Sequence, residues 1–88
     1  MRLALDYDSD IPLYRQISAY FRSSILAGSI NVGERLPAVR VLAADLGVSR
    51  ITVQSAYDEL VAEGLLVSRL GSGAYVLPHG FEQAASQP

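Results

Sequence analysis

The chain has 88 residues, half of them apolar, which suffices for one small domain with its own hydrophobic core. It has no cysteine and no lysine, and its single histidine, His79, has no nucleophile or carboxylate fixed beside it, so we expect no enzyme, no cofactor and no metal site in this chain. No run is long and apolar enough to span a membrane, and the aspartates near the N-terminus argue against a signal peptide, so we expect a cytoplasmic protein. The net charge of −2 argues at first sight against a nucleic-acid binder.

Residues 1–10 are expected to form a short N-terminal arm, in which alternating leucines would allow a brief strand. Pro12 suits the first position of a helix that Gly28 would end. The apolar residues of this helix recur at helical spacing: Leu13, Ile17, Tyr20, Phe21 and Ile25. Arg15 and Arg22 share another face, which is either solvated or in contact with DNA phosphates.

A second and shorter helix is expected to follow Pro37 and to end at Gly47, after a short strand over residues 34–36. Its apolar face consists of Val39, Leu42, Ala43 and Leu46. Gly47 and Val48 then make a tight turn into a third helix. Two short helices joined by a turn with a glycine predict a helix-turn-helix, whose second member is the recognition helix.

The third helix is predicted over residues 49–63, with Ser49 as its N-cap and Gly64 as the glycine that follows its C-terminus. The predicted buried face is Val53, Ala56, Tyr57, Leu60 and Val61. The outward face of the first two turns is Arg50, Ile51, Gln54 and Ser55, with Thr52 beside them, and farther along it is Asp58, Glu59 and Glu63. Because a DNA backbone would repel the acidic end, this helix is expected to enter a groove by its N-terminus.

Two short strands over residues 65–69 and 74–77, joined by a glycine-containing turn, predict a β-hairpin directly after the recognition helix, which is a wing. The expected fold class is therefore mainly α with a small β-hairpin, a winged helix-turn-helix of three helices plus a wing. The domain is expected to span residues 11–77, and residues 78–88 are expected to be a linker or a disordered tail.

Three stretches of the chain match one family in order and at its spacing: PLYRQI (12–17), ILAGSINVGERLPAVRVLAADLGVSRITV (25–53) and AYDELVAEGLLVSRLGSGAYV (56–76). With these segments the chain resembles the DNA-binding domain of GntR-family bacterial transcription regulators, and its last stretch is most similar to the MocR subfamily. In that subfamily a linker and a pyridoxal-phosphate aminotransferase-like domain follow the winged helix. The resemblance implies that this chain is the N-terminal part of such a regulator. The small YtrA-like members, which carry two further helices, are the competing subfamily.

The resemblance implies sequence-specific binding of double-stranded operator DNA, with recognition helix 49–63 in the major groove and wing 69–74 at the minor groove. It implies a homodimer for the full-length protein, whereas this fragment alone could be monomeric. The implied DNA contacts fall on Arg40, Ser49, Arg50, Thr52 and Gly71, and the chemistry of Ile51, Gln54 and Arg69 adds those three. The alternative function is a winged-helix protein-interaction module without specific DNA binding, which the charge of the chain would suit.

Each proposed contact also has a plainer interpretation. Arg50 could pair with Asp45 or remain free at the surface, Thr52 could bond only to nearby backbone, and Ile51 could pack on the neighbouring helix. The chain departs from the family at Ile51 and Gln54, which bears on the operator sequence. It departs again at Ala38, where relatives often have a serine that caps the second helix.

Overall fold

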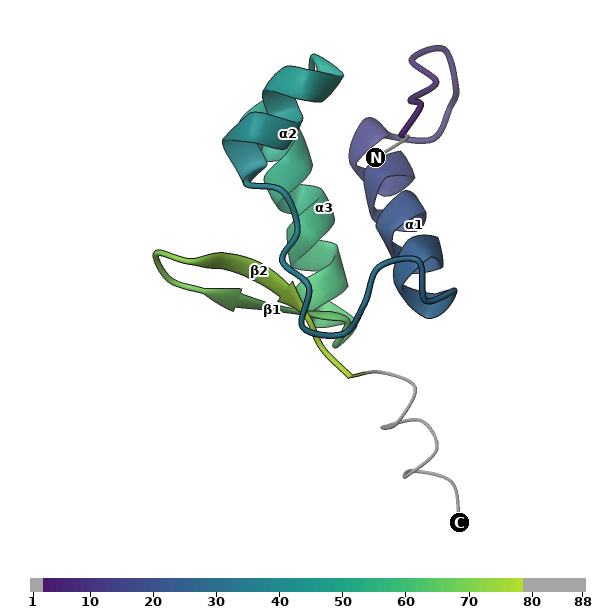
Figure 1. The fold of residues 1–88 in the computed structure, drawn as a ribbon. Helices are drawn as coiled ribbons and strands as arrows, with labels where there is room; N and C mark the ends of the chain where they lie inside the picture. The colour runs from purple at the N-terminus through teal and green to yellow at the C-terminus, as the bar shows by residue number, and fades with distance from the viewer. Residues whose placement is uncertain (1–2, 79–88) are drawn as a thin grey trace.

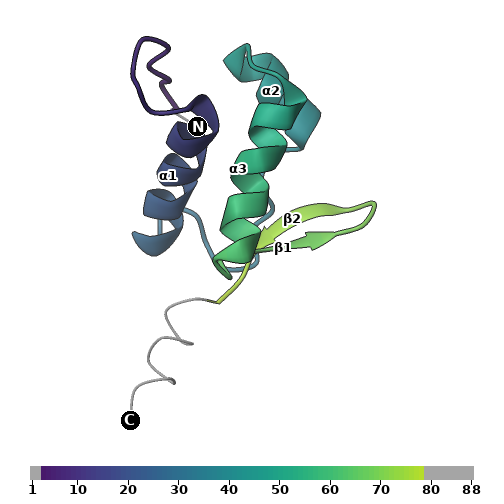
Figure 2. The same cartoon turned by 180° about the vertical axis from the view of Figure 1, so that it is seen from behind.

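A computed structural model describes residues 3–78 (Figures 1 and 2). Three helices are followed by a two-stranded antiparallel sheet, in the predicted order, and the winged helix-turn-helix fold is confirmed. The elements are α1 (Leu13–Leu26), α2 (Val39–Leu46), α3 (Arg50–Ala62), β1 (Leu66–Arg69) and β2 (Gly73–Val76). Helix α3 packs against both other helices, and the hairpin extends from its C-terminal end on the same side as α2. Within the described range, no helix combines the length and apolar character that crossing a membrane requires.

Both ends of α3 follow the predicted capping rules. At its N-terminus, the hydroxyl of Ser49 accepts a hydrogen bond of 3.1 Å from the backbone N–H of Thr52. At its C-terminus, the N–H of Gly64 bonds to the carbonyl of Val61 and the N–H of Leu65 bonds to that of Leu60, both at 3.0 Å. These two bonds form a Schellman motif, which ends the helix and directs the chain into the hairpin.

The core lies between α1 and α3 and continues beneath the hairpin. The rings of Phe21 and Tyr57 meet edge to face at 5.8 Å, and the Tyr57 hydroxyl donates a 2.6 Å hydrogen bond to the carbonyl of Pro37, at the entry to α2. Burial raises the pKa of Tyr57, so this hydroxyl keeps its proton. The fully buried larger side chains are Ile17, Phe21, Ile25, Val53, Leu60 and Leu66, together with the small polar Ser18.

One edge of the predicted buried face of α3 was wrong. Val53, Ala56, Tyr57 and Leu60 are buried as predicted, but Val61 is 37% exposed, because it turns toward the groove beside the hairpin. Glu59, predicted to face outward, turns toward α1 instead and is only partly exposed there. Helix α1 packs on the flank of α3 that carries Glu59, so this edge of the apolar stripe is buried and the edge that carries Val61 is not.

The two-stranded hairpin is extended by a single β-bridge to the segment before α2. Strands β1 and β2 pair from Leu66 with Val76 to Arg69 with Gly73. The strand predicted over residues 34–36 is reduced to one isolated bridge between Arg35 and Tyr75, flanked by backbone hydrogen bonds of 2.9 and 3.0 Å. This segment therefore covers the free edge of β2 just before the chain enters α2.

The N-terminal arm forms a loop over the helix ends, and no residue from 3 to 10 is in a strand. The brief strand expected there was therefore wrong. The side-chain amide of Gln16 bonds to both the N–H and the carbonyl of Asp6, and the Tyr7 hydroxyl donates a 2.6 Å hydrogen bond to the carbonyl of Leu46. These long-range bonds replace strand pairing. Of the expected C-terminal tail, residues 79–88 lie outside the described residues.

Candidate nucleic-acid interface

The arginines fall into two groups, and the first is held by carboxylates. The guanidinium of Arg22 forms a bidentate contact with Glu63, at 2.9 Å from Nε and 2.7 Å from Nη2, and this hydrogen bonding raises the pKa of Arg22. Arg15 lies 3.5 Å from the carboxylate of Glu59, and Arg22 lies 4.0 Å from it. The arginine face of α1 therefore neutralises the acidic C-terminal half of α3, which disfavours its use for DNA phosphates.

The second group has no such partner. Among residues 3–78, the guanidinium groups of the other four arginines lie within 4.0 Å of no carboxylate: Arg35, Arg40, Arg50 and Arg69. The plainer interpretation of Arg50, a pair with Asp45, is therefore not what the structure contains. Arg40 lies in the first turn of α2, Arg50 opens α3, and Arg69 stacks over the ring of Tyr75 with its Cζ 5.6 Å from the ring centroid.

The first turns of α3 present mixed chemistry to solvent. Ile51 is 78% exposed, so it does not pack on the neighbouring helix. The hydroxyl of Thr52 lies 2.9 Å from that of Ser49, within a local hydrogen bond. The amide nitrogen of Gln54 donates a 2.9 Å hydrogen bond to Asp58 one turn later. The first two turns of α3 thus carry an apolar side chain, two hydroxyls and a hydrogen-bonded amide, together with the Arg50 guanidinium, which has no carboxylate partner among residues 3–78.

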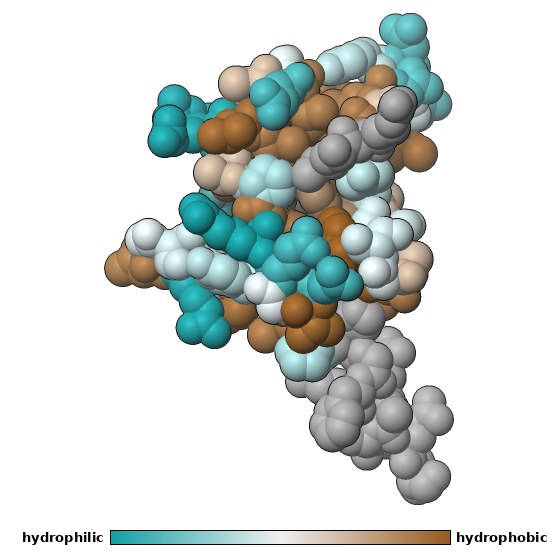
Figure 3. All heavy atoms as spheres, in the orientation of Figure 1, coloured by the Kyte–Doolittle hydropathy of each residue, from teal (hydrophilic) through white to brown (hydrophobic). Residues whose placement is uncertain are grey.

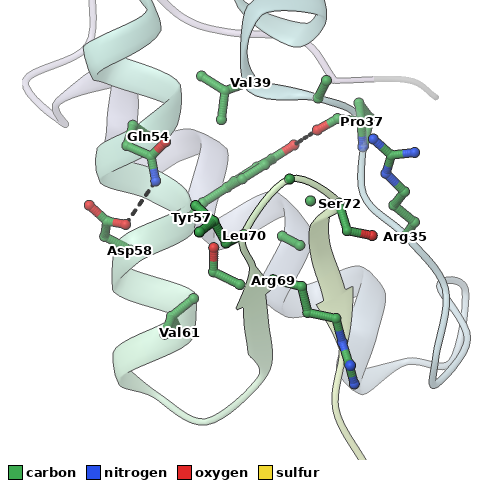
Figure 4. Close-up of a pocket in the computed structure, with 15 residues that line it drawn as sticks. Arg35, Pro37, Val39, Gln54, Tyr57, Asp58, Val61, Arg69, Leu70 and Ser72 are labelled. Atoms are coloured by element: carbon green, nitrogen blue, oxygen red, sulfur yellow. Dashed lines mark hydrogen bonds between the residues drawn. The ribbon is translucent and has the colours of Figure 1, made fainter.

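A groove of about 360 Å³ separates α3 from the hairpin (Figure 4). Gln54, Asp58 and Val61 line its helical side, and the segment entering α2 closes its upper end. The other wall is the hairpin from residue 68 to residue 74. The groove therefore brings together three of the predicted site residues, Gln54 on α3 and Arg69 and Gly71 on the hairpin, which the sequence alone had not indicated. The other five predicted residues do not line it: Arg40, Ser49, Arg50, Ile51 and Thr52.

The tip of the hairpin is apolar and open. Gly71 has a φ of +76° and open space around its Cα, so the backbone conformation, and not crowding, favours glycine there. The neighbouring Leu70 is fully exposed. Figure 3 shows hydrophobic atoms at the end of the hairpin and hydrophilic side chains across the centre of the same face. The sequence did not indicate Leu70 or Arg35 as residues of this surface, because neither belongs to a recognised motif. Leu70 is exposed at the hairpin tip, and Arg35 joins the surface only through its bridge to Tyr75.

Ala38 stands at the N-cap of α2 and supplies no side-chain hydrogen bond to that helix. The departure noted in the sequence thus leaves the start of α2 without the capping oxygen that a serine would provide.

Comparison with known proteins identifies the family. Residues 13–76 match the family described as "Bacterial regulatory proteins, gntR family". The chain is 53% identical over 74 residues to the probable rhizopine catabolism regulatory protein MocR of Rhizobium meliloti, covering 84% of this chain and 15% of that protein. It is 44% identical to the uncharacterized HTH-type transcriptional regulator YdeL of Bacillus subtilis, covering 80% of this chain and 15% of YdeL. The expected likeness to MocR is confirmed, and the chain spans 15% of the length of each of these relatives.

Solved structures agree with this. YtrA from Sulfolobus acidocaldarius, a GntR-family transcription factor, superposes with a TM-score of 0.82 at 32% identity, covering 94% of this chain and 87% of that one. The DNA-binding domain of AraR, solved in complex with operator ORE1, superposes with a TM-score of 0.72 at 33% identity, covering 86% and 93%. The fold is that of a regulator's DNA-binding domain and not of an enzyme domain. The chain belongs to the GntR family of bacterial regulatory proteins.

Proposed function

We propose that this chain binds double-stranded operator DNA in a sequence-specific manner, as the DNA-binding part of a transcription regulator acting in the cytoplasm. The observation that carries this proposal is the division of the arginines. Among residues 3–78, two arginines are bound to carboxylates between α1 and α3, and four have no carboxylate partner. One of these four lies on α2, one at the start of α3, one on the hairpin and one on the segment that enters α2. The net charge of −2 therefore understates the positive charge available to phosphates on that side.

The N-terminal turns of α3 enter the major groove in this proposal. Arg50, which is exposed and unpaired, suits bidentate hydrogen bonding to guanine, and Gln54 suits adenine. The exposed Ile51 offers an apolar contact to a thymine methyl group. Ser49 and Thr52 are placed where hydroxyls at a helix N-terminus can bond to a phosphate.

Two further elements fix the register of the helix. Arg40, on the first turn of α2, binds a backbone phosphate. The hairpin is the wing, whose tip at Gly71 approaches the adjacent minor groove while Arg69 binds phosphate beside it. The open surroundings of Gly71 support a close approach of backbone to DNA. The DNA-binding domain of AraR, which superposes on this chain, was solved in complex with an operator, and this supports binding of operator DNA.

The complete regulator is proposed to be a homodimer. The chain spans 15% of the length of MocR, so the pairing of two copies and the response to an effector would reside in the remaining part, which by resemblance is aminotransferase-like. A single winged helix covers one half-site, and regulators gain specificity when two such domains are held at a fixed spacing.

The test is selection of duplexes from a random-sequence pool by the 88-residue chain, followed by anisotropy titrations of a labelled selected duplex. Arg50→Ala should cost about 1–3 kcal/mol of binding free energy and relax the preference at one position. Arg15→Ala removes the same charge from α1 and is the matched control, with nearly unchanged binding expected. Recovery of no preferred sequence, or an affinity that salt does not change, would favour the protein-interaction module instead.

A further inference from the structure

One face of the wing carries residues that the proposed function does not use, in addition to Arg69, which it does use. Arg35 and Tyr75 are bridge partners, so their side chains leave the small sheet on the same side. Val67 pairs with Tyr75, and Arg69 pairs with Gly73, which places these residues on that side too. We call this set of five the outer wing face. It brings together two arginines that lie 34 positions apart in the sequence.

Both arginine side chains of the outer wing face lie against residues of the hairpin. A Cβ atom at Gly73 would lie 2.8 Å from Nε of Arg35, so the absence of a side chain there makes room for the Arg35 guanidinium. Arg69 lies over the ring of Tyr75, and the Tyr75 hydroxyl is hydrogen-bonded to Ser72 at the turn. Figure 4 shows Arg35 extending from the segment that enters α2 and Arg69 extending from the hairpin.

The charges of these two arginines are not compensated by the acids nearby. Among residues 3–78, neither guanidinium has a carboxylate within 4.0 Å. Glu34 uses its carboxylate to accept a 3.0 Å hydrogen bond from the N–H of Asn31. Asp58, on the helical side of the groove, accepts a hydrogen bond from the side-chain amide of Gln54. An exposed arginine that lies against the sheet and is bonded to no acid is suited to an external anion.

The spacing of the strands fits a duplex. Strand β2 lies between the segment that carries Arg35 and strand β1, which carries Arg69. Strands two places apart in a sheet are separated by about 10 Å. Long arginine side chains starting that far apart can reach the backbones on both sides of a minor groove about 6 Å wide.

We propose that Arg35 is a DNA-binding residue, and that it and Arg69 bind phosphodiester oxygens on the two sides of the minor groove that the wing enters. This inference rests on the proposed function and deepens it. It adds a DNA-binding residue that lies outside the helix-turn-helix and the hairpin. It also gives Gly73 a role, because a side chain there would displace the Arg35 guanidinium. Its ligand is the duplex backbone, so it contributes affinity and register and no direct base recognition.

The experiment compares Arg35→Gln, Arg69→Gln and the double variant with Arg15→Gln, which removes an equal charge from the opposite side of the domain. Binding of the 88-residue chain to a labelled duplex that it selects is measured by anisotropy over a range of salt concentrations. Each wing variant should reduce the magnitude of the slope of log K against log salt by about 0.9, which corresponds to a loss of about eightfold at 0.1 M salt. Arg15→Gln should retain the wild-type slope.

A second measurement distinguishes a direct contact between an arginine and one phosphate from the long-range electrostatic attraction of the whole protein for DNA. Uncharged methylphosphonate groups are placed one at a time along the minor-groove edges of the duplex. At one position the wild type should lose affinity while Arg35→Gln loses none, and Arg69→Gln should show the same behaviour at a position on the other strand. The proposal is overturned if Arg35→Gln keeps the wild-type slope, or if no methylphosphonate position is coupled to Arg35. Salt-insensitive binding by the wild type would instead overturn the proposed function itself.

Discussion

The hydroxyl of Ser18 donates a 2.6 Å hydrogen bond to Oε1 of Glu59, joining the middle of α1 to the C-terminal half of α3. Ser18 is fully buried, and the same carboxylate lies near the guanidinium groups of Arg15 and Arg22. This small polar network holds the helix that is proposed to read DNA against the rest of the domain. It also removes two arginines from the charge available to phosphates.

The first prediction concerns this network. Ser18→Ala should lower the free energy of unfolding by about 1–2 kcal/mol, because the partly buried carboxylate of Glu59 loses a hydrogen-bond donor. The change is measured by urea denaturation. Ser23→Ala is the matched control, since Ser23 is exposed on the same helix, and its effect should stay within about 0.5 kcal/mol of zero, on the stabilising side. Equal effects of the two substitutions would mean that the Ser18 bond contributes nothing.

The second prediction tests the corrected face of α3. Leu60 is fully buried in the core, so Leu60→Ala should cost about 2–5 kcal/mol of stability, a large part of what so small a domain has. Val61→Ala, one residue later and partly exposed, should cost less than about 1 kcal/mol. Thermal melts followed by circular dichroism measure both. A loss at Val61 as large as that at Leu60 would favour the face predicted from the sequence, in which both residues are buried.

The third prediction separates the two roles of Ser49. Its hydroxyl caps α3, so Ser49→Ala should lose about 0.5–2 kcal/mol of stability, whereas Ser49→Gly should lose only a few tenths. If the hydroxyl also binds phosphate, both variants should lose DNA affinity to a similar extent when measured well below their melting temperatures. Wild-type affinity in the glycine variant would leave Ser49 with capping as its only role.

Local chemistry made much of the fold predictable. Apolar spacing located all three helices, and the rules for helix ends located the Ser49 cap and the exit from α3 at Gly64. A glycine-containing turn between two short apolar runs located the hairpin. These signals depend on residues only a few positions apart, which is why the sequence alone reveals them.

What the sequence could not provide depends on distant partners. Glu59 turns toward α1 because its carboxylate accepts a hydrogen bond from Ser18, 41 positions earlier, and lies near two arginines of that helix. The arm forms a loop because Tyr7 reaches the carbonyl of Leu46, and Arg35 joins the wing because it bridges to Tyr75. The eight predicted DNA contacts stay predictions. The structure places them on α2, at the start of α3 and on the wing.

The last prediction concerns how strongly the isolated chain binds. Four arginines of residues 3–78 have no carboxylate partner, so if each neutralises one phosphate, the slope of log K against log salt should be about −3.6. A single domain covers one half-site, so its dissociation constant near physiological salt should be on the order of micromolar. Fusing the chain to a dimeric coiled coil through a flexible linker should tighten binding to two correctly spaced half-sites by about 10²- to 10⁴-fold, because the second domain then binds at a high effective concentration. A duplex with one half-site scrambled is the control and should show little of this gain. Nanomolar binding by a chain that ultracentrifugation shows to be monomeric on the DNA would contradict the argument, as would a fusion that gains nothing at any spacing.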